Sequence, residues 1–435
     1  MSRPPQRYWG TLRSSACQFL MSIVKGLLCG VPLLAANSGA LAYKNMANAR
    51  VVAMPEMRRP DYLQPATDPA FGTPFVRVTD PGRQMPGGMF CNPSYCRHRY
   101  SSAQAWNADQ TLLLIAHGCA GLCFLDGQTY QPLFRRRAAG ACEWHPNDPE
   151  LMICVSETEI YAWKVRNDSR TTIYAPTDYR SLRFGPSKGN LSNDGRKLVV
   201  RAANGAGRPV AFAYDVAAGT KHSDVELARL DGDNSYCSIA PSGRYVFCFQ
   251  VMPDKTNTAY IFDLEGRQLQ HWAENHRPGH GDMTIDSDGS DVYVGVSKAA
   301  ADKYHVIKRR LKDGAITDLV PRGQAQHASI RNINRPGWVF LTYGGTYAKA
   351  AAHRGWAPFY QEVVALRIDG SGEIRRIVHT RSVKQDYRSE AQASPSPDGS
   401  QVIWSSNWGQ NGGPVAAYVA RPRWSETISE QLSRK

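Results

Sequence analysis

Ser192-Asn193-Asp194-Gly195 is a polar turn, and a strand-like run from Leu198 to Arg201 follows it. This pattern of a turn and a short apolar run occurs seven times after residue 100. The other turns are Trp106-Asn107-Ala108-Asp109, Trp144-His145-Pro146-Asn147-Asp148, Ala240-Pro241-Ser242-Gly243, Asp286-Ser287-Asp288-Gly289, Asn334-Arg335-Pro336-Gly337 and Ser396-Pro397-Asp398-Gly399. From Asp109 to Asp398, successive turns lie 39, 46, 48, 46, 48 and 62 residues apart. A regular period in this range indicates a repeated supersecondary unit.

The composition of each repeat favours a small antiparallel sheet. Asn, Asp, Gly and Pro in the turns suit tight hairpins, and the Val-, Ile- and aromatic-rich runs suit strands. Further strand candidates follow in most repeats, such as Tyr260 to Phe262 and Val364 to Ile368. Two β-sandwiches would not share one period over such a length. We therefore predict an all-β fold, a seven-bladed β-propeller with four strands in each blade.

The seventh repeat lacks an outer strand, because a polar tail follows Val419. Residues 74–79, which precede the first repeat, can supply that strand. Their pairing would close the ring and remove two exposed sheet edges. We therefore expect a propeller over residues 73–423, an N-terminal extension over residues 43–72 and a polar tail over residues 424–435.

The first 42 residues have the features of a secretory signal peptide. Basic residues precede an apolar run from Gly26 to Ala36, and Ala40-Leu41-Ala42 offers small residues for cleavage. An uncleaved membrane anchor is the alternative, but 11 apolar residues are too few to span a bilayer, and no later segment is apolar enough for a span. We predict a periplasmic or secreted protein without a transmembrane span after cleavage.

Cysteine usage agrees with export. Eight cysteines remain after signal removal, namely Cys91, Cys96, Cys119, Cys123, Cys142, Cys154, Cys237 and Cys248. An even number in an exported chain favours disulfides. The first four can pair locally or cross-pair, and buried free thiols are the alternative. A zinc site on those four would have spacings that match no common zinc module.

The net charge of the full chain is +14. Signal removal takes away four positive charges, which leaves +10. A basic exported protein favours anionic partners such as acidic polysaccharide. We expect no nucleic-acid partner, since no nucleic-acid-binding motif is present.

Polar side chains precede several turns, where the innermost strand of each blade is expected to line the channel. These include His280 and Asp282, His327 and Arg331, and Glu390 and Gln392. Neutral imidazoles with carboxylate and amide oxygens suit manganese, zinc or a similar divalent ion. The alternative is that His280 and His327 join neighbouring blades structurally.

These stretches resemble a known group of proteins. Gly279-His280-Gly281-Asp282, Gln326 to Asn332, Glu390-Ala391-Gln392 and Arg97 to Ser101 are similar to exported bacterial seven-bladed propellers, the polysaccharide lyases that cleave ulvan and oligogalacturonate. The resemblance covers roughly residues 70–420 at the level of the repeats. It is specific for the propeller and less so for the activity, since one fold hosts many functions.

The resemblance implies site residues. Oligogalacturonate lyases carry a His-x-His pair before the last turn, where this chain has Gln392 and Ser394. A site for a divalent ion (Mn, Ca or Zn) would keep His280, His327 and Gln392 as ligands but would lack that histidine pair. Ulvan lyases line their groove with two histidines, which His98 and His117, 19 residues apart, match. Those enzymes also use a tyrosine and an arginine, for which Tyr236 and Arg183 are the candidates.

The implied reaction is β-elimination on a uronate-containing polysaccharide or oligosaccharide. His98 or His117 would remove the C5 proton, and Tyr236 would protonate the departing oxygen. Arg183, or a metal on His280 and His327, would neutralise the carboxylate.

A non-catalytic propeller that binds glycan or protein is the rival function. A long insertion from Ala348 to Pro358 follows the sixth turn, and long loops are often functional. Trp356, Phe359 and Tyr360 could stack on sugars or on a partner protein. A hydrolase is a weaker third option, because no paired carboxylates stand out.

Overall fold

The structure, a computed structural model, describes residues 49–184, 191–227, 236–251, 257–272, 278–297, 304–320, 323, 325–345 and 358–424. The chain divides into residues 1–38 and 39–435, and all described residues belong to the second unit. The predicted signal peptide, residues 348–357 of the insertion and nearly all of the polar tail lie outside the described residues. Among the described residues, no helix is long and apolar enough to cross a membrane.

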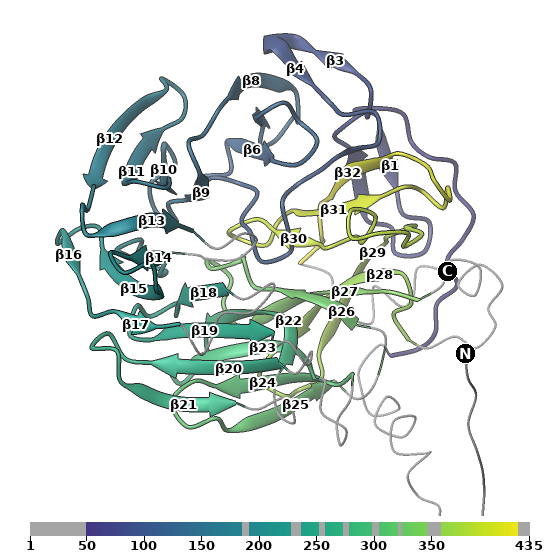
Figure 1. Ribbon diagram of the computed structural model, residues 1–435. Coiled ribbons are helices and arrows are strands. Elements are labelled where there is room, and N and C mark those ends of the chain that lie inside the picture. The colour runs from purple at the N-terminus through teal and green to yellow at the C-terminus, as the bar shows by residue number, and fades with distance from the viewer. Residues whose placement is uncertain are drawn as a thin grey trace, which may run out of the picture. The chain divides into compact units, whose positions relative to one another are not determined.

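Within the second unit, the described residues form seven mainly antiparallel blade sheets that follow one another around a ring, and a separate two-stranded sheet of β3 and β4 (Figure 1). This confirms the predicted seven-bladed propeller. Blade 2 contains β9 (Ala141–Trp144), β10 (Leu151–Val155), β11 (Ile160–Lys164) and β12 (Ser169–Tyr174). Blade 3 contains β13 (Tyr179–Arg183), β14 (Lys197–Asn204), β15 (Pro209–Asp215), β16 (Thr220–Lys221) and β17 (Val225–Glu226).

Blades 4 to 6 have the same order, from an inner strand before the turn to an outer strand. Blade 4 contains β18 (Tyr236–Ile239), β19 (Val246–Val251), β20 (Asn257–Phe262) and β21 (Gln268–Trp272). Blade 5 contains β22 (Pro278–Ile285), β23 (Asp291–Ser297), β24 (Val306–Arg310) and β25 (Ile316–Val320). Blade 6 contains β26 (Ala325–Ser329), β27 (Trp338–Tyr343), β28 (Glu362–Arg367) and β29 (Ile374–His379).

Blade 1 is less regular. It has β6 (Leu112–Ile115), β7 (Leu122–Asp126) and β8 (Pro132–Arg136), and an isolated bridge from Trp106 to Leu113 marks its inner edge. Before it lie β3 (Gln84–Met85), the 3-10 turn η1 (Pro86–Gly88), β4 (Met89–Phe90) and β5 (Tyr95–Cys96). β5 pairs in parallel with the last blade and so connects the first blade to it.

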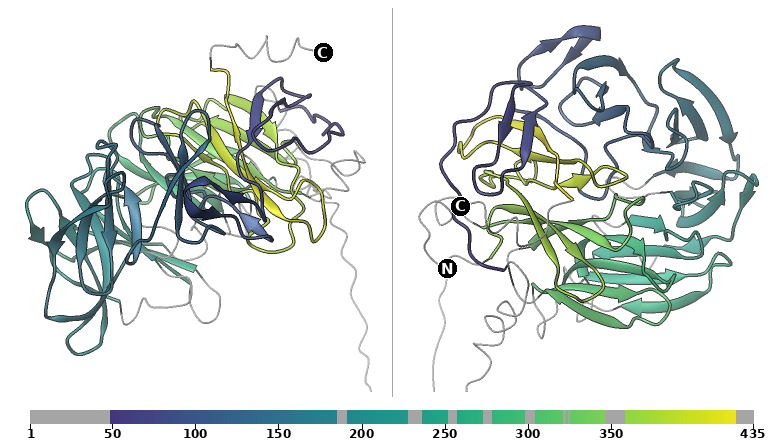
Figure 2. Two further views of the ribbon diagram at one scale, coloured as in Figure 1. Left: turned by 90° about the horizontal axis from the view of Figure 1, so that it is seen from above. Right: turned by 180° about the vertical axis from the view of Figure 1, so that it is seen from behind.

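The first and last parts of the described chain build blade 7 together. Its inner strands are β30 (Ser394–Pro395), β31 (Val402–Ser406) and β32 (Val415–Ala420). Its outer strands are β2 (Pro74–Arg77) and β1 (Pro65–Thr67), and Val76 of β2 faces Val419 of β32. The predicted closure by an N-terminal strand is therefore confirmed, and these strands lie together in both views of Figure 2.

The turns behave as their composition predicts. Gly195, Gly243, Gly289, Gly337 and Gly399, the glycines that end five of the seven turns, all have positive φ. A side chain at Gly195 would also overlap the His145 ring of the neighbouring blade, so glycine meets two demands there.

The N-terminal extension, which precedes the first blade, forms hydrogen bonds with blades 6 and 7. Asp68 is completely buried and accepts hydrogen bonds from the Arg381 guanidinium and the His379 backbone, both at 3.0 Å. Arg381 also donates to the carbonyl of Pro55 at 3.1 Å. The indole of Trp408 donates to the Met57 carbonyl at 2.9 Å. The described part of the N-terminal extension is thus attached to the propeller by several hydrogen bonds.

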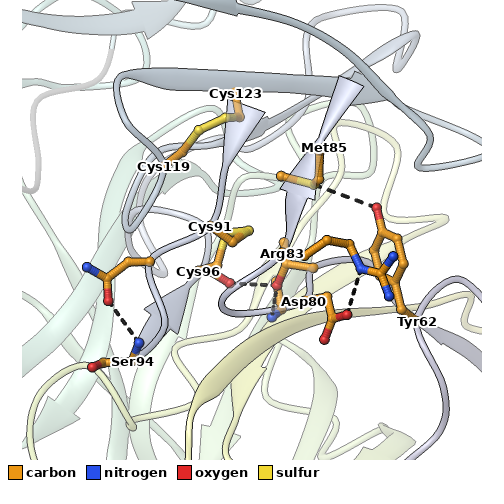
Figure 3. Close-up of a disulfide and its surroundings, with 12 residues drawn as sticks. Tyr62, Asp80, Arg83, Met85, Cys91, Ser94, Cys96, Cys119 and Cys123 are labelled. Carbon is orange, nitrogen blue, oxygen red and sulfur yellow. Dashed lines mark hydrogen bonds and ion pairs between the residues drawn. A yellow bond between two sulfur atoms is a disulfide. The ribbon is translucent and has the colours of Figure 1, made fainter. Parts of the chain in front are cut away.

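The eight cysteines form four pairs at disulfide distance, Cys91–Cys96, Cys119–Cys123, Cys142–Cys154 and Cys237–Cys248. The first two are the local pairs that sequence left open (Figure 3). The last two each join an inner strand to the next strand of the same blade, at directly opposite positions. This pairing favours the disulfide interpretation over free thiols or zinc.

Candidate functional site

Four blades bring polar side chains together near the start of their inner strands. Blade 1 contributes residues 97–100, in an irregular segment where Arg97 pairs through its backbone with His117. Blade 5 contributes His280 on β22, and blade 6 contributes His327 on β26. Blade 7 contributes residues 384–392, which lie between β29 and β30. We call this set the channel cluster.

Arg97, His98 and Gln392 form the buried floor of the channel cluster. The Arg97 guanidinium donates to the Gln392 side-chain oxygen and to the carbonyl of Arg388, the latter at 2.8 Å. The His98 Nε2 lies 2.6 Å from the Gln392 carbonyl, which can only accept, so that nitrogen carries the hydrogen. Burial and the Arg97 charge lower the pKa of His98 to about 3. His98 is therefore a neutral ring with no exposed surface.

A buried carboxylate lies between a histidine and a lysine. Glu390 Oε2 is 3.3 Å from His327 Nε2, and Glu390 Oε1 is 2.5 Å from the Lys384 ammonium. Burial raises the pKa of Glu390, but His327 and Lys384 lower it more, to about 2. Glu390 is thus ionised at every physiological pH.

Aromatic rings cover the histidines. The Tyr100 hydroxyl is 3.3 Å from His280 Nδ1, and its ring stacks on Tyr387, with centroids 5.8 Å apart. The rings of His280 and His327 meet edge to face at 4.9 Å. His280 is exposed and has φ of 50°, at a point where the β22–β23 register shifts. The shift presents the imidazole away from the regular sheet.

The predicted catalytic residues occupy different environments. His117 is exposed, and desolvation together with Arg97, Arg99 and Arg388 lowers its pKa to about 4. A neutral imidazole near neutral pH can accept a proton.

The predicted tyrosine and arginine lie farther from the cluster. Tyr236 is buried and its hydroxyl is 3.5 Å from that of Tyr293, which accepts from the Gly281 backbone at 3.1 Å. Tyr236 is therefore linked to β22, near the channel cluster, through Tyr293. Arg183 is exposed at the end of β13, where it faces Arg201. No contact between Arg183 and the cluster occurs among the described residues.

The predicted metal ligands are close together, but two of their donor atoms are already engaged. The Gln392 side-chain oxygen accepts from Arg97, and His280 Nδ1 faces Tyr100. In the described ranges, no three His, Cys, Asp or Glu side chains are grouped as metal ligands. Two cations, Arg97 and Lys384, also bond to the oxygens that a divalent ion would use. As arranged, these residues do not fit a metal, although the metal itself stays a prediction.

Two aromatic residues proposed for sugar stacking are core residues. Phe359 is completely buried and packs against Tyr343 at 5.2 Å, and Tyr360 is also buried. The expectation that they stack on a ligand is therefore wrong, since the chain turns inward before β28. Trp356 lies outside the described residues.

Sequence reasoning missed Lys384, Tyr387 and Arg388. They lie in an irregular segment between blades 6 and 7, outside the repeat, so no register pointed to them. All three are exposed. The only available signal was the run Lys384-Gln385-Asp386-Tyr387-Arg388, which combines cations with an aromatic ring directly before Glu390.

A separate pocket lies among the turns that follow the inner strands. Gln104, Trp144, Asn193 and Arg331 are among its lining residues. None of the predicted catalytic or metal residues lines it, so the channel cluster is the better candidate site.

The fold resembles that of solved lyases. An oligogalacturonate lyase from Vibrio parahaemolyticus aligns with a TM-score of 0.55 and 12% identity, over 84% of this chain and 97% of that one. An oligogalacturonate lyase in complex with manganese aligns with a TM-score of 0.57 and 16% identity, over 83% and 96%. At such identities the likeness shows the propeller fold that the sequence had suggested, not the activity. No family model and no curated protein matches the chain.

Proposed function

We propose that this protein is an exported lyase that cleaves uronate-containing acidic polysaccharide or oligosaccharide by β-elimination. The channel cluster carries the proposal, because it gathers the exposed imidazole of His280, two tyrosines and several cations at one place, beside the exposed His117. The shared fold of oligogalacturonate lyases adds support. The positive net charge and the paired cysteines favour an exported protein with an anionic partner.

The proposed reaction breaks the C4–O bond of a uronate. A base takes the C5 proton, the released electron pair forms the C4=C5 double bond, and the departing oxygen gains a proton. His117 suits the base better than His98, because His117 is exposed and neutral near neutral pH, whereas His98 is sealed in the floor. A cation near the substrate carboxylate stabilises the carbanion-like transition state.

The proton donor and the carboxylate-binding cation have more than one candidate. Tyr236 and Arg183 remain the residues that the family resemblance implies. Tyr387 is half exposed and stacks on Tyr100 within the channel cluster, so it is a second candidate for the donor. Comparison of Tyr236→Phe with Tyr387→Phe separates the two, since only loss of the donor slows leaving-group departure while preserving substrate binding.

The decisive test is ultraviolet absorbance of the mature protein with a panel of uronate polymers, measured at the band of 4,5-unsaturated uronates. An increase with one polymer supports elimination and identifies the substrate class. A flat trace across the panel, with and without Mn²⁺ or Ca²⁺, contradicts the lyase proposal. That outcome favours a propeller that binds glycan or protein without cleaving it.

A further inference from the structure

The channel cluster already contains its own cations. The side-chain oxygen of Gln392 accepts from Arg97, and Glu390 Oε1 bonds to Lys384 at 2.5 Å. Glu390 Oε2 faces His327 and, at 3.4 Å, the amide nitrogen of Gln392. Every oxygen that could bind a divalent ion here is therefore next to a hydrogen-bond donor of the protein.

We propose that Lys384 occupies the metal position of this site and binds the substrate carboxylate directly, so that the site works without a divalent ion. This inference rests on the proposed lyase function for the identity of the ligand. The presence of the Lys384 cation in the site does not depend on the lyase function, because Lys384 is part of the chain.

The geometry of Lys384 suits both roles. Glu390 is 8% exposed and anchors one side of the ammonium, whereas the Lys384 side chain is 59% exposed. An ammonium has three N–H donors. Among the described residues, Glu390 is its one ion-pair partner, so donors remain for a carboxylate that arrives from solvent. Because the nearby Arg97 and Arg388 add positive charge, the site attracts anions and repels Mn²⁺.

A divalent ion would have to displace a cation before it could bind. It would need the Glu390 carboxylate, which is already neutralised by Lys384, and it would approach Arg97 at Gln392. Removal of the lysine leaves Glu390 beside His327, with His280 in contact with that ring. One carboxylate and two imidazoles are a suitable donor set for Mn²⁺ or Zn²⁺. In the described residues these three side chains are not grouped as metal ligands, and we expect them to form a metal site only when Lys384 is removed.

The first experiment measures thermal unfolding of the full mature protein against MnCl₂ concentration. Wild type is expected to show no Mn²⁺-dependent rise in Tm, and Lys384→Met is expected to show one. The double variant Lys384→Met/Glu390→Gln should lose that rise, and Lys164→Met, an exposed lysine on β11, should behave as wild type. A rise in wild type, or no difference between wild type and Lys384→Met, overturns the proposal.

The second experiment measures kcat/KM on the uronate polymer that gives the absorbance signal, with EDTA present. Wild type should keep full activity, while Lys384→Met should lose about 10²-fold and Lys384→Arg should keep most of it. Loss of wild-type activity in EDTA would contradict a metal-independent site. If no polymer is cleaved, the lyase function fails, but the Mn²⁺ titration still decides whether Lys384 blocks a metal site.

Discussion

The Arg331 guanidinium and the Asp282 carboxylate face each other in two parallel hydrogen bonds, at 2.8 Å from Nε and 2.7 Å from Nη2. The same carboxylate accepts from the Ile330 backbone at 2.8 Å. Both side chains are buried, and the pair joins the inner strand of blade 5 to the segment that follows the inner strand of blade 6. Two residues that the repeat placed in the channel thus join neighbouring blades of the ring.

Asp282→Ala is expected to destabilise the protein by about 3–5 kcal/mol, because it leaves the Arg331 charge buried without a partner. Urea unfolding of the variant and of wild type gives the difference. Asp282→Leu combined with Arg331→Met should recover much of the loss. A cost below about 1 kcal/mol for Asp282→Ala would show that water reaches the guanidinium.

Histidines 98 and 117 should respond differently to substitution. His117→Ala is expected to abolish lyase activity with little change in Tm, since the side chain is exposed. His98→Ala is expected to lower the unfolding free energy by about 2–4 kcal/mol, because it leaves a cavity and an unbonded carbonyl at Gln392. Activity assays and thermal melts of both variants check this. Equal loss of stability in the two variants would make His117 a structural residue.

Removal of residues 74–79 should abolish cooperative unfolding. The deletion takes away β2, leaves β1 without a partner and exposes the edge of β32. Calorimetry of the deleted protein is the measurement, and a deletion of residues 425–435 is the control. A deleted protein that still melts in one sharp transition would show that the ring is stable when open.

The ionised carboxylate of Asp68 should stabilise the folded protein at neutral pH, and this stabilisation should be lost in acid. Burial raises its pKa, but the hydrogen bond and charge of His379 and the charge of Arg381 lower it further, to well below the usual range. A depressed carboxylate pKa contributes stability above the unfolded value of about 3.9, and the contribution is lost as the pH falls through the folded value. The stability difference between wild type and Asp68→Asn should therefore be large at pH 7 and shrink below about pH 4. Asp61→Asn, at an exposed site, should show no such trend.

The repeat made the fold predictable, because each turn fixes a hairpin and each apolar run fixes a blade face. The runs Leu112 to Ile115 and Leu151 to Val155 coincide with β6 and β10. The same periodicity placed His280 and His327 beside each other across two blades. Strand pairing between positions more than 300 residues apart also followed from a simple count of missing strands.

The other residues of the site could not be predicted from the sequence, for physical reasons. Lys384 and Tyr387 belong to a segment without period, so no register relates them to a neighbour. Tyr293 is on the second strand of blade 5 and reaches the channel cluster beside the register shift in β22. Arg183 was chosen without a motif, and its position on β13 depends on a strand end that the turn spacing does not fix.

The strand order of blade 7 has a consequence for biosynthesis. β2 is made before all seven repeats, and β32 is made after the first six blades. The first six blades can therefore form their own sheets during synthesis, but the ring can close only after β32 has been made. A chain that stops before β32 keeps two open sheet edges, which are templates for aggregation and targets for proteases. Both edges are thus hidden only once β32 has paired with β2.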